Sequence, residues 1–234
     1  MSVDKSAVRV REMFGQIAPR YDLLNRLLSA GIDQRWRKKT VRLVPPEGSA
    51  PILDLCTGTG DLALAYAQAA AGRAAVIAAD FCRPMLVRGA QKSRPLGAAV
   101  AYVEADALRL PFADNTFQIV SVAFGLRNLV DTDAGLVEMT RVLRPGGRLA
   151  VLEFSLPRRQ PLKAVYGWYF HRVLPRIGQA LARNRLDAYN YLPNSVREFP
   201  SGSELVARMA AAGLAEVWHR PLTFGVATLY VGRK

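Results

Sequence analysis

The sequence has few of the residues that cross-link small proteins or bind metal ions. Its 234 residues include two cysteines, Cys56 and Cys82, and two histidines, His171 and His219. Two cysteines exclude a disulfide framework and a cysteine-based zinc site, and they fit a reducing compartment. Because the histidines lie far apart in the sequence, we expect no histidine-rich metal site.

Long uncharged apolar runs are also missing. None approaches the roughly 18 residues that a membrane-spanning helix needs. The first residues, MSVDKSAVRVREM, carry charges throughout and lack the apolar centre of a signal peptide. We therefore expect a chain that neither spans a bilayer nor carries a secretion signal.

Acidic residues are scarce relative to basic ones. Lys and Arg number 32 and Asp and Glu 19, which gives a formal net charge of +13. Such an excess serves solubility, nucleic-acid binding or contact with an anionic membrane surface. Apolar residues make up 50% of the chain, which excludes wholesale disorder and allows a sizeable core.

The chain alternates between helical and strand-like patterns. The spacing predicts helices within residues 5–43, with Gly31 as a stop, before Pro45-Pro46-Glu47-Gly48 breaks the pattern. Strands are expected at 51–55, 75–80, 99–104, 117–124, 148–154, 215–221 and 225–231, and later helices at 61–71, 84–91, 133–143 and 203–212. This order predicts an α/β fold with a mostly parallel seven-stranded sheet, helices on both faces and an antiparallel C-terminal strand.

The most informative stretch is a glycine-rich turn after the first strand, Ile52-Leu53-Asp54-Leu55-Cys56-Thr57-Gly58-Thr59-Gly60-Asp61. Glycines let the backbone turn sharply there, and the following helix offers unpaired N–H groups. Asp80 ends the next strand, where a carboxylate can accept from both hydroxyls of a ribose. The motif Gly58-x-Gly60-x-x-Ala63 fits a dinucleotide site, and the same logic fits an S-adenosylmethionine (SAM) site.

Three features favour SAM over a dinucleotide. Asp54 precedes Gly58 in the D-x-x-x-G-x-G pattern of class I methyltransferases. Asp106 and Ala107 follow the third strand, where an acid and a backbone N–H can recognise adenine. Leu143-Arg144-Pro145-Gly146-Gly147 leads into the fifth strand, as is frequent in this superfamily. Together they predict a class I SAM-dependent methyltransferase with a Rossmann-like fold.

Further motifs resemble the C-methyltransferases of menaquinone and ubiquinone biosynthesis, the UbiE/MenG type. The motifs are Phe14, Ala18-Pro19-Arg20-Tyr21-Asp22, Asn25, Ser29, Gly31 and Trp36; Phe124-Gly125-Leu126-Arg127-Asn128 and Leu152-Glu153-Phe154-Ser155; Val173-Leu174-Pro175-Arg176-Ile177-Gly178; Tyr189-x-Tyr191-Leu192-x-x-Ser195-Val196-Arg197-x-Phe199-Pro200; and Leu222-Thr223-x-Gly225-Val226-Ala227. The resemblance covers roughly residues 10–232. The chain departs from the family at Ala123, where a serine is common, and at Thr57, which replaces a glycine and mildly constrains the turn.

The resemblance implies C-methylation of a polyprenyl quinol ring by SAM, converting demethylmenaquinol to menaquinol. The alternative acceptor is a 2-methoxy-6-polyprenyl-benzoquinol. An RNA methyltransferase, which the basic charge invites, another phenolic acceptor and a non-enzymatic binding module are less favoured. The implied cofactor-binding residues are Asp54, Gly58, Thr59, Gly60, Asp80, Asp106 and Ala107. No metal is expected.

Candidate catalytic residues lie at the end of the fourth strand and in the N-terminal segment. Arg127 is always protonated, so it suits stabilisation of a phenolate, and Asn128 suits orientation of a hydroxyl or water. Tyr21 and Asp22 are expected to cap the substrate pocket. The base that removes the ring proton is left open between Asp22, His171 and a water molecule, and His219 is expected to be structural.

We predict one domain over residues 1–234, with a helical N-terminal segment at 1–48 and a basic aromatic insertion at 155–200. The insertion holds eight basic residues, two acids and the aromatic run Val165-Tyr166-Gly167-Trp168-Tyr169-Phe170. Basic charge beside aromatic rings is typical of segments at a membrane surface, and also of a lid whose basic face is exposed to solvent. We expect a cytoplasmic protein in peripheral contact with the anionic inner face of the membrane. No nucleic-acid partner is expected, and the sequence is compatible with an oligomer.

Overall fold

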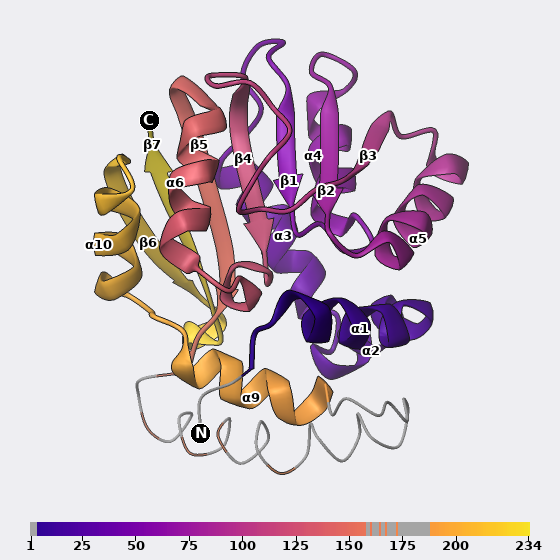
Figure 1. The fold of residues 1–234 in the computed structure, drawn as a ribbon, viewed down its shortest axis with the longest axis vertical. Helices are drawn as coiled ribbons and strands as arrows, with labels where there is room; N and C mark the ends of the chain where they lie inside the picture. Colours follow the sequence, from indigo (N-terminus) through magenta and orange to yellow (C-terminus); the bar gives the residue numbers. More distant parts are fainter. Residues whose placement is uncertain (1–3, 158–159, 161–163, 165–166, 168–171, 173–187) are drawn as a thin grey trace.

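The computed structural model describes residues 4–157, 160, 164, 167, 172 and 188–234. Seven strands form one sheet: β1 (Ile52–Leu55), β2 (Val76–Asp80), β3 (Val100–Glu104), β4 (Phe117–Ala123), β5 (Leu143–Phe154), β6 (Ala215–Leu222) and β7 (Ala227–Arg233). Their order across the sheet is β3-β2-β1-β4-β5-β7-β6, as Figure 1 shows. Strands β1 to β5 pair in parallel, and β7 runs antiparallel to both β5 and β6. The predicted sheet is confirmed.

One strand begins earlier than predicted. Strand β5 starts at Leu143 rather than near Arg148, because Leu143 already pairs with Phe117 of β4. The next pair joins Arg148 to Ile119, so the Arg-Pro-Gly-Gly stretch is an irregularity inside the ladder. Gly146 has a φ of +75° there, a conformation that favours glycine.

The helices flank the sheet: α1 (Ala7–Ile17), α2 (Tyr21–Leu28), α3 (Ile32–Leu43), α4 (Asp61–Ala70), α5 (Arg83–Ser93), α6 (Thr132–Val142), α9 (Ala188–Glu198) and α10 (Ser203–Ala211). Short 3-10 helices include η3 (Leu126–Asn128) and η5 (Thr223–Gly225). The helices predicted within residues 5–43 and those predicted along the sheet are confirmed. Among the described residues, no helix combines the length and apolarity needed to cross a bilayer.

Two cores form because side chains alternate between the faces of each strand. On one face, Leu53 and its neighbours pack against Leu136 of α6 and Leu205 of α10. On the other face, Ile52 and its neighbours pack against Trp36 of α3 and Tyr66 of α4. Helices therefore cover both faces, as the alternating pattern predicted.

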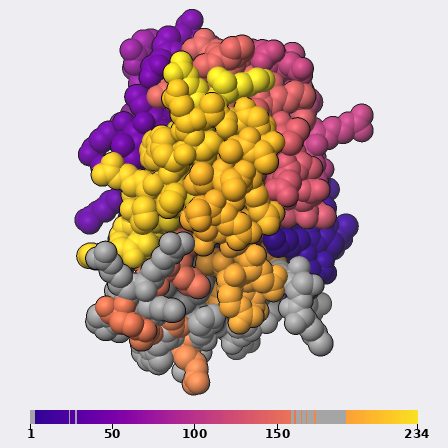
Figure 2. All heavy atoms as spheres, turned by 90° about the vertical axis from the view of Figure 1, so that its left-hand side faces the viewer, coloured from indigo at the N-terminus to yellow at the C-terminus, as the bar shows by residue number. Residues whose placement is uncertain are grey.

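Helices α1, α2 and α9 lie beyond the carboxyl ends of the parallel strands (Figure 1). Ile17 and Ala18 bury their side chains against Cys82 and Met85, which ties the N-terminal helices to the start of α5. Strand β6 is one edge of the sheet, with β7 beside it; α10 flanks these two strands, and this side of the molecule faces the viewer in Figure 2. An open α/β sheet places its ligands at the carboxyl ends of strands, and there the N-terminal helices complete the walls.

Candidate active site

The glycine-rich turn adopts left-handed backbone at three positions. Cys56, Gly58 and Gly60 have φ values of +48°, +58° and +82°. Gly60 stands immediately before α4, and a Cβ there would lie 2.5 Å from the phenol oxygen of Tyr102. Thr57 keeps a negative φ, so its replacement of a glycine leaves the turn unstrained, contrary to expectation. The non-glycine residue with unfavourable backbone is Cys56 instead.

Asp54 is held beneath this turn by two hydroxyl groups. Thr57 Oγ1 donates to Asp54 Oδ2 at 2.6 Å, and Ser121 Oγ donates to Oδ1 at 2.7 Å. Ser121 sits opposite Asp54 in the β1–β4 register. Burial raises the pKa of Asp54 to about 6, although these hydrogen bonds lower it. The carboxylate is therefore a site at which a bound cation would be stabilised.

Asp80, at the end of β2, connects two backbone segments. Its Oδ2 accepts the Gly58 N–H at 2.8 Å, and its Oδ1 accepts the Cys82 N–H at 2.9 Å. Burial raises the pKa of Asp80 to about 6, and the backbone hydrogen bonds oppose that rise. An ionised carboxylate has about four acceptor positions, so Asp80 keeps capacity for the hydroxyls of a ribose.

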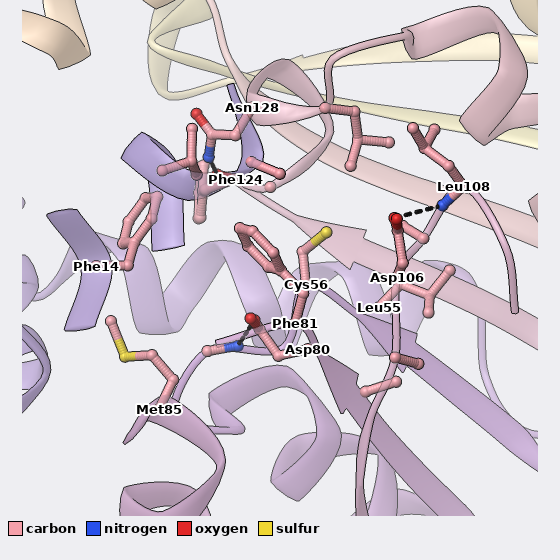
Figure 3. Close-up of a pocket in the computed structure, with 18 of the residues that line it drawn as sticks. Phe14, Leu55, Cys56, Asp80, Phe81, Met85, Asp106, Leu108, Phe124 and Asn128 are labelled. Atoms are coloured by element: carbon pink, nitrogen blue, oxygen red, sulfur yellow. Dashed lines mark hydrogen bonds between the residues drawn. The ribbon is translucent and has the colours of Figure 1, made fainter. Parts of the chain in front are cut away.

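Asp106 and Ala107 form a second recognition point after β3. Asp106 Oδ1 accepts the Leu108 N–H at 2.9 Å, which fixes the loop (Figure 3). The Ala107 N–H has no acceptor among the described residues. An acid beside an unpaired N–H matches the donor and acceptor edge of adenine.

A cleft that is partly open to solvent joins these groups. Figure 3 shows Asp106 and Leu108 on one side of the cleft, Phe14 on the opposite side, and Cys56 and Asp80 between them. Carboxylates near apolar walls are what a nucleoside requires, so the residues present fit SAM.

Several residues that line the cleft were not predicted from the sequence. Phe14, Phe81, Met85 and Leu108 line the cleft but were not predicted to bind the cofactor. Phe81 and Leu108 carry a detectable signal, since each follows closely on a predicted acidic residue at a strand end. Phe14 was noted only as part of the N-terminal motif, and Met85 carries no signal, because the place of both in the cleft depends on how α1 packs on α5.

Arg127 lies away from the cleft wall. Its side chain is buried, Nη1 lies 2.7 Å from Glu153 Oε1 and also donates to the Phe124 carbonyl, and the guanidinium stacks over Phe154. Its backbone N–H donates to Glu153 Oε2 at 3.3 Å. These contacts fix the η3 turn, which carries the next residue, Asn128.

Asn128 does line the cleft. Its Oδ1 accepts the Tyr191 hydroxyl at 3.1 Å, which brings α9 against η3 and sets the orientation of the amide. Ala123 also lines the cleft, at the position where a serine hydroxyl was noted as absent. The site therefore presents an amide, and not a guanidinium, to this part of the cleft.

Tyr21 and Asp22 take different positions. Tyr21 lines the cleft, with its ring edge-on to Phe14, and burial raises its pKa. Asp22 Oδ1 accepts the Thr59 hydroxyl, and Asp22 Oδ2 lies 2.9 Å from Lys92 Nζ. Lys92 also binds Asp61 Oδ1 at 2.7 Å, so Asp22 and Thr59 fasten α2 to the glycine-rich turn.

The structure thus divides the predicted site residues into three groups. Those that line the cleft are Tyr21, Gly58, Asp80, Asp106, Ala107 and Asn128. Asp54 and Thr59 line a smaller pocket beneath the turn, while Asp22, Gly60 and Arg127 support the walls. His219 lies on β6 and stacks on Tyr230, and His171 lies outside the described residues. No group of three potential metal ligands occurs in the described part of the chain.

Comparisons with known proteins agree with this geometry. Residues 1–234 match the model of the ubiE/COQ5 methyltransferase family. A ubiquinone/menaquinone biosynthesis C-methyltransferase, UbiE, of Geobacter sulfurreducens is 46% identical over 228 residues, covering 97% of this chain and 88% of that protein. A demethylmenaquinone methyltransferase of Thermus thermophilus is 52% identical over 220 residues, covering 94% of this chain and 99% of that protein.

Solved structures support the fold. The [4+2]-cyclase SpnF matches with a TM-score of 0.70 at 16% identity, covering 100% of this chain and 96% of that one. A SAM-dependent methyltransferase from Aquifex aeolicus matches with a TM-score of 0.60 at 20% identity, covering 84% of this chain and 88% of that one. Identities this low establish the shared architecture alone.

Proposed function

Because the chain belongs to the ubiE/COQ5 methyltransferase family, we propose that it methylates a ring carbon of a polyprenyl quinol, with SAM as the methyl donor. The observation that carries this is one continuous cleft with two chemically different halves. Asp80, Asp106 and Ala107 suit a nucleoside, while Phe14, Phe124 and Asn128 offer an aromatic wall with one amide. An aromatic acceptor with few polar groups fits the second half.

The acceptor we favour is demethylmenaquinol. Relatives from Thermus thermophilus and Deinococcus radiodurans, at 52% and 45% identity, are named demethylmenaquinone methyltransferase. The equivalent benzoquinol of ubiquinone biosynthesis is the second candidate, because other relatives carry a name that covers both pathways.

When bound, SAM supplies a methyl group on a sulfonium centre, for which a quinol carbon beside an ionised hydroxyl is a suitable nucleophile. Asn128 is the residue we assign to that hydroxyl. Its Oδ1 accepts from Tyr191 and its Nδ2 donates one proton to the Phe124 carbonyl at 3.5 Å, so the second Nδ2 proton remains to donate to a quinol oxygen. Apolar residues of α1 and the ring of Tyr21 line the same cleft, and such a bond is stronger where apolar walls displace water.

Arg127 acts through Asn128 in this proposal. Its ion pair with Glu153 holds η3, and its positive charge lies near the amide that contacts the acceptor. Asp22 is proposed to hold α2 in place, since both of its oxygens are already bound. A water molecule is then the base that we assign to the ring proton.

We further propose peripheral contact with an anionic membrane, because a polyprenyl tail keeps the acceptor in the bilayer. Support comes from the net charge of the 155–200 insertion and from exposed apolar side chains. Leu23 and Leu27 of α2 and Phe224 of η5 are 65%, 54% and 84% exposed. The aromatic run and most arginines of the insertion lie outside the described residues. No nucleic-acid partner is proposed.

Product analysis tests the proposed function. The protein is incubated with SAM and short-tailed demethylmenaquinol or demethylated benzoquinol under reducing conditions, and products are identified by mass spectrometry. We expect methylation of the naphthoquinol. Incorporation of methyl groups into added RNA, with neither quinol modified, would replace this assignment. Liposome flotation that does not depend on anionic lipid content would count against the membrane contact.

A further inference from the structure

Lys5 brings an ammonium group to the part of the cleft that Asn128 lines. The residue precedes α1, its side chain is partly buried, and it lines the cleft together with Val10 and Asn128. The next two lining residues after Asn128 are Leu129 and Val130, which are apolar. Partial burial of an ammonium beside apolar side chains costs free energy unless a partner or a ligand compensates the charge.

The protein supplies little compensation for the charge of Lys5. In the part of the chain that the structure describes, the Lys5 side chain has neither an ion pair nor a hydrogen bond. The charged groups that influence it over longer distances are Glu198 of α9, Arg127 of η3, Glu153 of β5 and Arg208 of α10. Arg127 and Glu153 already pair with each other at 2.7 Å. The ammonium is therefore available to a ligand.

The surroundings of Lys5 favour an anion in the cleft. Burial is the strongest influence on the pKa of Lys5 and lowers it, because the ammonium loses contact with water. Asp4, on the same segment, pairs with Arg9, and the Tyr191 hydroxyl of α9 donates to the side chain of Asn128. An anionic oxygen that entered the cleft beside Lys5 would restore the stability of the protonated form and would itself be stabilised.

We propose that Lys5 is a catalytic residue, whose ammonium contacts the quinol oxygen bound by Asn128 and stabilises that oxygen in its ionised form. The inference rests on the proposed function. The hydroxyl proton passes to water, the oxygen keeps the electron pair as an anion, and Lys5 stays protonated. Asn128 donates as a neutral amide, whereas a bond between an ammonium and an anionic oxygen is about twice as strong. The positive charge that was expected from Arg127 is thus assigned to Lys5.

The pH dependence of turnover distinguishes this role from a structural one. Methyl transfer to short-tailed demethylmenaquinol is measured anaerobically at saturating SAM, from about pH 6 to about pH 9.5. In the wild type the ammonium lowers the pKa of the bound hydroxyl, so kcat rises with pH through a low midpoint. Lys5→Met should raise that midpoint by about one pH unit or more and lower kcat near pH 7 at least about tenfold, with a smaller loss at high pH. Lys5→Arg keeps the charge and should retain most of the wild-type profile.

Controls separate the role of Lys5 from general effects of charge and stability. Lys38→Met removes an exposed lysine of α3 and should change neither kcat nor its pH dependence. If thermal unfolding shows that Lys5→Met does not fold, Lys5→Gln takes its place. A fall in kcat that is uniform across the pH range, with the midpoint unmoved, would overturn the proposal, as would an unchanged kcat. Absence of methyl transfer to quinol by the wild type would instead refute the proposed function itself.

Discussion

The cofactor side and the acceptor side of the cleft differ in how their residues are assembled. On the cofactor side, Asp54 lies within β1, Asp80 ends β2 and Asp106 follows β3, and these three strands are parallel neighbours in one sheet. On the acceptor side, Tyr21, Asn128 and Tyr191 come from α2, η3 and α9. The sheet fixes the first group through backbone pairing, whereas the second depends on side-chain contacts between separate elements. Substitutions on the two sides should therefore impair the protein in different ways.

The largest effect is expected from Arg127→Met. It leaves Glu153, which is 1% exposed, as an uncompensated buried carboxylate, and breaking such a pair costs about 3–5 kcal/mol of unfolding free energy. Denaturant unfolding measures this. The double variant Arg127→Met/Glu153→Leu should recover most of the stability but not turnover. Full recovery of turnover would contradict the role of Arg127 in holding Asn128.

The substitution Asp80→Asn tests the cofactor side. It removes the charge that accepts two backbone N–H groups and, in our account, the ribose hydroxyls, so affinity for S-adenosylhomocysteine should fall on the order of 100-fold. Calorimetry gives the affinity. Asp114→Asn, at an exposed position, is the matched control. Turnover lost at saturating SAM with unchanged affinity would show that Asp80 serves the acceptor side.

The substitution Asn128→Ala tests the acceptor side. Loss of one preorganised donor should lower turnover with quinol roughly 10–100-fold and leave S-adenosylhomocysteine affinity within about twofold. Tyr191→Phe removes the group that orients the amide and should produce a smaller loss in the same direction. A matching loss of cofactor affinity in Asn128→Ala would erase the distinction between the two sides.

The pH dependence of stability and of SAM affinity should also distinguish the cofactor side from the acceptor side. Burial raises the pKa of Asp54 and of Asp80 to about 6 from 3.8, so both retain protons in the folded protein between these values. Their contribution to stability is thus present below pH 3.8 and is lost as the pH rises through about 6. SAM binding favours the ionised forms, so affinity should rise roughly tenfold from pH 5 to 7.5. Asp80→Asn should weaken this dependence of affinity on pH. A pH profile identical to that of the wild type would contradict the role assigned to Asp80.

The smallest effect is expected where the two sides meet. Lys92→Met removes the cation between Asp22 and Asp61, a partly exposed cluster, so cofactor affinity should fall only about threefold. Lys38→Met, at an exposed site, should change nothing. Loss of more than about 30-fold would mean that α2 contributes directly to the cofactor site rather than covering it.

The difference between the two sides of the cleft also determines which site residues can be predicted from the sequence. The sheet, its strand ends and most acids of the cofactor side follow from hydrophobic periodicity and spacing, because those residues are local to their strands. The Arg127–Glu153 pair depends on β4 lying beside β5, and the Asp22–Lys92 contact joins α2 to α5. No local pattern encodes such pairings, so Arg127 was expected in the cleft when it lies behind the wall.

One measurement tests the central claim most directly. SAM carrying a trideuterated methyl group is supplied with short-tailed demethylmenaquinol under reducing conditions, and the product is examined by mass spectrometry and NMR. We predict a single trideuterated methyl group on the ring carbon next to a hydroxyl. Transfer to a quinol oxygen, or no transfer by protein that binds S-adenosylhomocysteine normally, would contradict ring C-methylation.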